Sequence, residues 1–188
     1  MSAQAVIRLR RTLSNTRKPV LYVPCDYRRR ADQTVGHMFA SLLRQLGYFS
    51  TKVLEKLKAL HKRCKEQSLR PVGKDLEKEL EEALGLAGDV CIVIDALDEC
   101  HKGPRSMLIN ELKRLSSEST IHLLVTARGE SDIEALFEGS LRLSIKATEE
   151  DIELYAKGRG NHFEQDLVSD QELRDKVVRA VVDASEGM

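Results

Sequence analysis

This chain of 188 residues has no tryptophan, and aromatic residues make up only 4% of it. Such a composition argues against a surface that stacks the bases of single-stranded nucleic acid. Basic and acidic residues number 30 each, so the formal net charge is zero. A neutral chain has no global attraction to nucleic acid or to an anionic membrane. We therefore expect neither as a partner.

Long apolar runs and closely spaced cysteines are also missing. No apolar run reaches the length of a transmembrane helix, and the first residues lack the apolar region of a secretory signal. His61 and Cys64 lie one helical turn apart, but no second pair completes a zinc site. The four cysteines form no CxxC pair and lie far apart, at Cys25, Cys64, Cys91 and Cys100. Reduced thiols in a cytoplasmic protein are the simplest interpretation.

The chain does contain apolar, β-rich runs that alternate with helical patterns of apolar residues. Such alternation is typical of βα units and of a mainly parallel sheet. Residues 20–25 and 90–94 are predicted to be buried strands, and residues 121–125 form another apolar, β-rich run. Apolar and polar residues alternate over 141–145, which predicts a half-exposed edge strand. Thr34 is expected to cap the helix after the first strand, and Thr148 and Asp151 form a capping-box pattern.

Acidic residues directly follow the second predicted strand. Asp95 comes immediately after the apolar run, and Asp98 and Glu99 follow within the next turn. In α/β folds, ligands bind at the carboxyl ends of the strands. In a nucleotide-hydrolysing protein Asp95 would hold Mg²⁺ there, and Asp98 or Glu99 would polarise the attacking water. The alternative for Asp95 is an N-cap or turn aspartate of the kind that follows many parallel strands. The alternative for Asp98 and Glu99 is a solvated acidic loop.

Arginines follow the other two strands. Arg128 comes after the third strand, where a guanidinium could reach a terminal phosphate. The alternative is a surface arginine paired with a nearby acid. Three arginines follow the first strand, at Arg28, Arg29 and Arg30. A solvated basic turn is the simpler interpretation for them, because no aromatic residues interleave them.

The residues 98–101 (DECH) resemble the DExH box of a helicase. In helicases that box follows the strand immediately, whereas here three residues intervene. We therefore do not favour a helicase.

Four segments carry a more extensive resemblance. They are YVPCDYRRRADQT (22–34), VCIVIDALDEC (90–100), IHLLVTARGESDIEALF (121–137) and LSIKATEEDIELYAKGR (143–159). Together they resemble NACHT-type P-loop NTPases, and among these the nephrocystin-3-like N-terminal domain of fungal-type STAND proteins. The resemblance implies an α/β fold with a three-layer P-loop NTPase-like core and a mainly parallel sheet. That core would cover residues 1–147, and residues 148–188 would start a helical subdomain.

The resemblance also implies roles for individual residues. Asp95 matches the magnesium-binding aspartate of the Walker B segment. Asp98 and Glu99 match the paired acids, one of which orients the hydrolytic water, and Arg128 matches the arginine of the sensor segment. The implied ligands are ATP or GTP with Mg²⁺. The implied function is the nucleotide-dependent switch of a cytoplasmic signal-transduction ATPase, in which nucleotide exchange shifts a closed monomer toward an oligomer.

The phosphate cradle of that family, G-x-x-x-x-G-K-[ST], has no match in this sequence. By the resemblance, residues 1–13 are expected to be the helix after the P-loop lysine, so the chain would begin just past the cradle and lack its strand. Walker B alone is a weak magnesium site, because Mg²⁺ depends on substrate phosphates for binding. We therefore expect this polypeptide alone to bind ATP poorly and to hydrolyse it negligibly. The alternative is a non-catalytic protein-interaction module, with protein partners or self-association.

The sensor segment departs from the family pattern. The family usually has Thr-Ser-Arg-Pro there, whereas this chain has Ala127 before and Gly129 after the arginine. Glycine frees the backbone that proline restrains, so we expect a looser turn.

Overall fold

The structure is a computed structural model that describes residues 7, 8, 11, 12, 18–68, 71, 73–118, 120–145, 147, 148, 150–152, 154, 155, 176, 179 and 180. The chain divides into two compact units, Met1–Glu138 and Gly139–Met188, and most of the described residues belong to the first. Within the described residues, no helix combines the length and apolar character needed to cross a bilayer. The expected helix of residues 1–13 and the expected subdomain of residues 148–188 lie mostly outside this described part.

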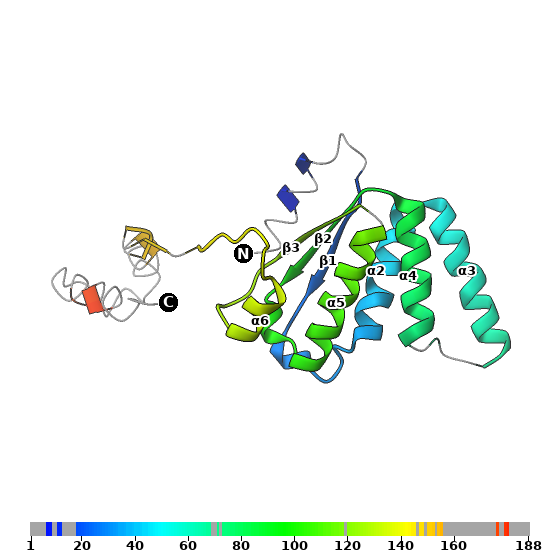
Figure 1. Cartoon of the computed structure of the whole chain (residues 1–188), viewed down its shortest axis with the longest axis horizontal. Helices are drawn as coiled ribbons and strands as arrows, with labels where there is room; N and C mark the ends of the chain where they lie inside the picture. The colour runs from blue at the N-terminus through cyan, green and yellow to red at the C-terminus, as the bar shows by residue number, and fades with distance from the viewer. Residues whose placement is uncertain are drawn as a thin grey trace, which may run out of the picture. The chain divides into compact units, whose positions relative to one another are not determined.

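Strands and helices alternate in the first unit (Figure 1). In chain order the elements are β1 (Val20–Pro24), the 3-10 turn η2 (Tyr27–Arg29), α2 (Val35–Phe49), α3 (Thr51–Glu66), α4 (Gly73–Ala87), β2 (Val90–Asp95), the 3-10 turn η3 (Leu97–Glu99), α5 (Lys102–Glu118), β3 (Ile121–Val125) and α6 (Ser131–Leu136). The predicted cap of α2 is confirmed, since the Thr34 hydroxyl accepts a hydrogen bond from the N–H of His37 at 3.2 Å. The three strands also lie where the apolar pattern predicts them.

The three strands form one parallel sheet in the order β1-β2-β3, with β2 at the centre. The register pairs Pro24 with Asp95 and Ile94 with Val125. All three strands therefore end at the same edge, where η2, η3 and the loop after β3 follow them. The α/β class and the parallel sheet predicted from the sequence are confirmed.

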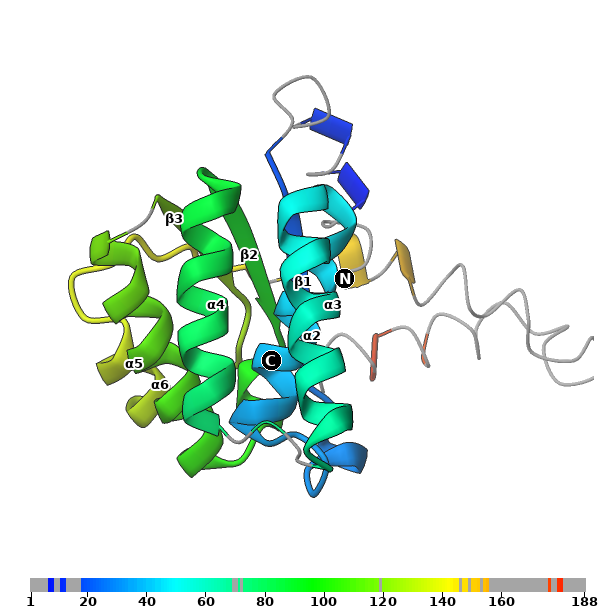
Figure 2. The same ribbon diagram turned by 90° about the vertical axis from the view of Figure 1, so that its right-hand side faces the viewer.

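The helices gather on one face of this sheet, with α3 outermost against α2 and α4 (Figures 1 and 2). Successive side chains of a strand point to opposite faces, so alternate residues of each strand enter the core beneath these helices. In β2 these are Val90, Ile92 and Ile94, all fully buried. The opposite face holds a smaller buried cluster of Val20, Cys91 and Val93. Burial on both faces explains why β2 is a continuous apolar run.

A side chain closes the outer edge of β1. The carboxamide of Gln45, on α2, accepts a hydrogen bond from the N–H of Tyr22 and donates one to its carbonyl, both at 2.9 Å. These two bonds satisfy backbone groups that an added strand would otherwise take. A further strand cannot pair with Tyr22 without displacing Gln45.

In the second unit, the edge strand predicted over residues 141–145 is wrong. The segment has no strand structure, and its apolar side chains at Leu141, Leu143 and Ile145 are 100%, 83% and 72% exposed. A strand needs a partner for its backbone hydrogen bonds, and a local alternation of residues does not supply one. The capping box is confirmed: the N–H of Thr148 donates to the carboxylate of Asp151, and the N–H of Asp151 donates to the hydroxyl of Thr148, both at 3.1 Å.

Candidate functional site

The acidic residues and the arginine selected from the sequence lie at the carboxyl edge of the sheet. Asp95 ends β2, and Asp98 and Glu99 lie on η3 immediately after it. Arg128 lies on the loop between β3 and α6. Neighbouring parallel strands bring these loops to one edge, which is the usual ligand-binding position in α/β sheets.

Hydroxyl groups from β1 and from the residue after β3 orient the half-buried carboxylate of Asp95. Its Oδ1 accepts a hydrogen bond from Oγ1 of Thr126 at 2.6 Å, and its Oδ2 accepts one from the phenol of Tyr22 at 3.2 Å. Tyr22 comes from β1, and Thr126 directly follows β3. These two donors orient the carboxylate, as hydrogen bonds from neighbouring groups do for carboxylates that bind a metal ion. The sequence did not identify either hydroxyl as a partner of Asp95.

The backbone turns sharply after Asp95. Ala96 has φ 53° and ψ 50°, the left-handed region, which costs a residue with a Cβ about 1–2 kcal/mol. Thr126 holds this turn in place. Its Oγ1 accepts a hydrogen bond from the N–H of Ala96 at 3.0 Å, and its carbonyl accepts one from Leu97 at 2.9 Å. Stored strain of this kind occurs at functional sites, and here it directs η3 along the edge of the sheet.

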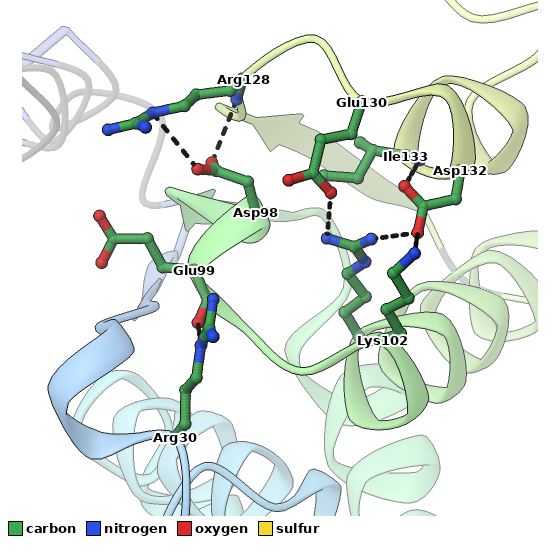
Figure 3. A network of polar contacts seen from close by, with 9 residues as sticks. Arg30, Asp98, Glu99, Lys102, Arg128, Glu130, Asp132 and Ile133 are labelled. Carbon is green, nitrogen blue, oxygen red and sulfur yellow. Dashed lines mark hydrogen bonds and ion pairs between the residues drawn. The ribbon is translucent and has the colours of Figure 1, made fainter.

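Asp98 and Arg128 bind each other directly. Oδ1 of Asp98 accepts a hydrogen bond from the backbone N–H of Arg128 at 3.1 Å, and Oδ2 lies 3.6 Å from the Arg128 Nε (Figure 3). The Asp98 side chain is 10% exposed, whereas the Arg128 side chain is 87% exposed. The acid therefore lies beneath the loop, and the guanidinium projects into solvent. Arg128 is thus a surface arginine paired with a nearby acid, which was the alternative interpretation from the sequence. This pairing still leaves its guanidinium accessible to an anion.

Glu99 contacts the segment after β1 instead. Its Oε2 accepts a hydrogen bond from the N–H of Tyr27 at 3.1 Å, and its carbonyl accepts one from Nε of Arg30 at 2.8 Å. Glu99 thus connects η3 to η2, while Asp98 connects it to the loop after β3. The two acids form specific contacts on opposite sides of η3.

Arg105 anchors the far end of the loop between β3 and α6, which carries Arg128. It is 2% exposed and is the one buried polar or charged residue in the described part of the chain. Its Nη1 donates to Glu130 at 3.0 Å and its Nη2 donates to Asp132, which also lies 3.2 Å from the ammonium of Lys102 (Figure 3). Burial acts to lower the pKa of Arg105, but the two carboxylates outweigh it and raise the pKa. No local pattern in the sequence indicated this cluster.

Two buried thiols lie under the same edge of the sheet. Cys25 follows β1 and Cys100 follows η3, and they are 6% and 2% exposed. A hydrogen bond between the two thiols lowers the pKa of Cys100 to about 7, with further help from the positive charge of Arg105, and raises the pKa of Cys25 above its usual range. Both cysteines are unbridged.

A magnesium ion would have one oriented protein ligand here, Asp95. Across the described ranges, no group of three or more His, Cys, Asp or Glu side chains is arranged to hold a metal ion. Mg²⁺ commonly binds through one or two carboxylates and takes its other ligands from water and substrate phosphates. A single carboxylate fixed by two hydroxyl donors fits that pattern.

The fold and site define an α/β protein with a parallel sheet and an acidic, arginine-bearing edge at the carboxyl ends of its strands. The family model described as "Nephrocystin 3, N-terminal" matches residues 1–128, which is more than half of the 188 residues. The chain belongs to this family. The matched region includes Asp95, Asp98 and Glu99 and ends at Arg128. No curated protein matches the chain.

Proposed function

We propose that this chain supplies the magnesium side and the sensor side of the nucleotide site in a NACHT-type P-loop NTPase, the switch domain of a STAND signalling ATPase. The main support for this proposal is that Asp95, the Asp98–Arg128 pair and Glu99 all lie at one edge of a parallel sheet. The family match supports the proposal because it covers the same part of the chain.

Each residue of the site has a proposed task. Asp95, oriented by Tyr22 and Thr126, would hold Mg²⁺, which when bound neutralises charge on the phosphates of ATP or GTP. The exposed guanidinium of Arg128 would pair with a phosphate oxygen. Asp98 and Glu99 both stay candidates for polarising the water, since each lies within one turn of Asp95.

The proposal includes weak binding by these residues alone. The sequence contains no G-x-x-x-x-G-K-[ST] motif. In P-loop proteins the backbone N–H groups and lysine of that motif make most contacts to the phosphates. Asp95 and Arg128 would supply only part of those contacts, so hydrolysis by the 188-residue chain should be negligible.

Titration of the chain with a fluorescent ATP analogue tests this proposal. We expect a dissociation constant of about 1 mM or weaker, equivalent to about 4 kcal/mol of binding free energy, in the presence of Mg²⁺. Asp95→Asn should abolish the magnesium-dependent part. The matched control is Asp89→Asn, because Asp89 lies at the opposite end of β2 and pairs with Lys18 and His122. Micromolar affinity would contradict the weak binding, and binding indifferent to Mg²⁺ and to Asp95 would contradict the site.

A protein-interaction module is the second candidate function. Tyr48 and Phe49, at the junction of α2 and α3, are 82% and 51% exposed. Exposed aromatic residues of this kind are enriched at protein interfaces. Sedimentation of the chain and of Tyr48→Ser tests this candidate. Self-association that the substitution weakens, in a chain that binds no nucleotide, would favour the module over the nucleotide site.

A further inference from the structure

The loop that carries Arg128 has glycine at a position where space does not require one. A Cβ added to Gly129 would meet its nearest atom, Oε1 of Glu134, at 3.7 Å, which is an ordinary contact. Glycine leaves the backbone free to adopt many conformations. The conformation of this loop must therefore be imposed by its contacts with the rest of the unit.

Three sets of contacts hold the loop. At its start, Thr126 bonds to the end of β2, as described above. In its middle, the N–H of Arg128 bonds to η3. Past Gly129, Glu130 and Asp132 both bond to Arg105. The first two sets lie before the glycine, so the Arg105 contacts are the ones that restrain the loop beyond its most flexible residue.

The Arg105 contacts are suited to this task because the guanidinium is buried. A buried charge is costly unless it is paired and hydrogen-bonded, so Arg105 strongly favours a loop conformation that delivers both carboxylates. Its planar fork directs Nη1 to Glu130 and Nη2 to Asp132, which a lysine could not reproduce. Arg105 lies in the first turn of α5, where its N–H bonds to the carbonyl of His101 at 3.0 Å. Because α5 follows η3 closely, the same rigid segment anchors both Asp98 and Arg105.

We propose that Arg105 is a positioning residue for Arg128. By holding Glu130 and Asp132, it keeps the loop in the conformation in which the N–H of Arg128 bonds to Asp98 and the guanidinium projects into solvent. The role of the guanidinium toward a phosphate rests on the proposed function. The restraint of the loop by Arg105 does not depend on the proposed function, because it operates without nucleotide.

Amide hydrogen exchange on the nucleotide-free 188-residue chain tests the proposal. In Arg105→Gln we expect the Arg128 amide to exchange about tenfold faster or more, while the amides of Ile92 and Ile94 change by less than about threefold. The matched control is Arg114→Gln. Arg114 lies on the same helix and pairs with Glu77 and Glu81 of α4 and with Glu111 of α5. This control should leave the Arg128 amide unchanged.

A second variant covers the case in which Arg105→Gln does not fold. Glu130 and Asp132 are 43% and 39% exposed, so the double variant Glu130→Gln, Asp132→Asn weakens the same contacts from the solvent side. It should show the same selective loss of protection at Arg128. Gly129→Ala, added to either variant, should restore part of that protection because it narrows the conformations open to the loop.

Two results would overturn the positioning role. One is Arg128 exchange that stays unchanged when the Arg105 contacts are removed. The other is exchange that rises equally at Arg128 and in β2, which would assign Arg105 to global stability alone. A selective loss of protection at Arg128, in a chain whose nucleotide binding is indifferent to Mg²⁺ and to Asp95, would support the positioning role and contradict the proposed function, so the two failures are distinguishable.

Discussion

Asp95 and Thr126 are joined across the carboxyl edge of the sheet by a hydrogen bond of 2.6 Å, although they lie 31 residues apart in the chain. The Thr126 hydroxyl also accepts a hydrogen bond from the N–H of Ala96, the residue with a left-handed backbone. One side chain therefore orients the candidate magnesium ligand and stabilises the strained turn after it. The loop after β3 and the turn after β2 form a single structure at this edge.

Thr126→Val tests that relationship. Valine keeps the shape of threonine but removes both hydroxyl hydrogen bonds, so we expect the free energy of unfolding to fall by about 1 kcal/mol. Urea denaturation measures the change. Thr12→Val is the control, because the exposed hydroxyl of Thr12 bonds to the carbonyl of Arg8, four residues earlier in the chain. Equal stability of the two variants would argue against a structural role for the Thr126 hydroxyl.

Ala96→Gly should behave unlike an ordinary alanine-to-glycine change. At φ 53° glycine relieves the strain of the Cβ, which offsets its larger entropy loss on folding, so we expect no loss of stability or a gain of about 0.5 kcal/mol. Ala59→Gly, on the exposed side of α3, should instead destabilise by about 1 kcal/mol. Thermal or chemical unfolding compares the two. A loss at Ala96 as large as that at Ala59 would show that the turn is not strained.

Gln45→Ala should expose the outer edge of β1. The N–H and carbonyl of Tyr22 would lose their partners, at an expected cost of about 1–2 kcal/mol. An open edge strand also favours pairing between molecules, so light scattering should detect more self-association. The control is Arg44→Ala, at the neighbouring exposed position of the same helix. A Gln45 variant that matches this control in stability and association would contradict the closing role of the carboxamide.

The paired thiols predict a rise in stability between pH 7 and pH 9. The hydrogen bond from Cys25 lowers the pKa of Cys100 from 9.0 to about 7. A group whose pKa is lowered by folding stabilises fully above its unfolded value and loses that contribution as the pH falls through the folded value. Under reducing conditions, we therefore expect the free energy of unfolding to rise by about 2 kcal/mol across this interval.

Removal of the Cys25 thiol, the hydrogen-bond donor, provides the control for the rise in stability with pH. Cys25→Ala should flatten the rise, because Cys100 then loses the hydrogen bond that favours its thiolate. Cys64→Ala, which lies away from the Cys25–Cys100 pair, should preserve the rise in stability. The raised pKa of Cys25 acts in the opposite direction above about pH 9, where the unfolded thiol ionises and the folded one does not. A rise of equal size in all three proteins would exclude the thiol pair as its source.

The predictions from sequence succeeded where the cause is local. The apolar run Val90–Ile94 was sufficient for a buried parallel strand, because burial on both faces removes any polar alternation. Thr34 was sufficient to start α2, since an N-cap bonds only to the first turn of its own helix. Residues 141–145 show the opposite case, because a strand depends on a distant partner that the alternation of side chains does not specify.

The sequence by itself determined the α/β class, the three parallel strands and the fact that Asp95, Asp98, Glu99 and Arg128 follow strand ends. Only the tertiary structure decided their partners. Asp98 bonds to Arg128, Glu99 bonds to Tyr27, and Arg105 bonds to Glu130, at separations of 25 to 72 residues. Strand order, register and loop conformation bring such residues together, and these depend on the packing of the whole unit. Side-chain type and spacing select the candidates for a site, and three-dimensional packing decides which of them meet.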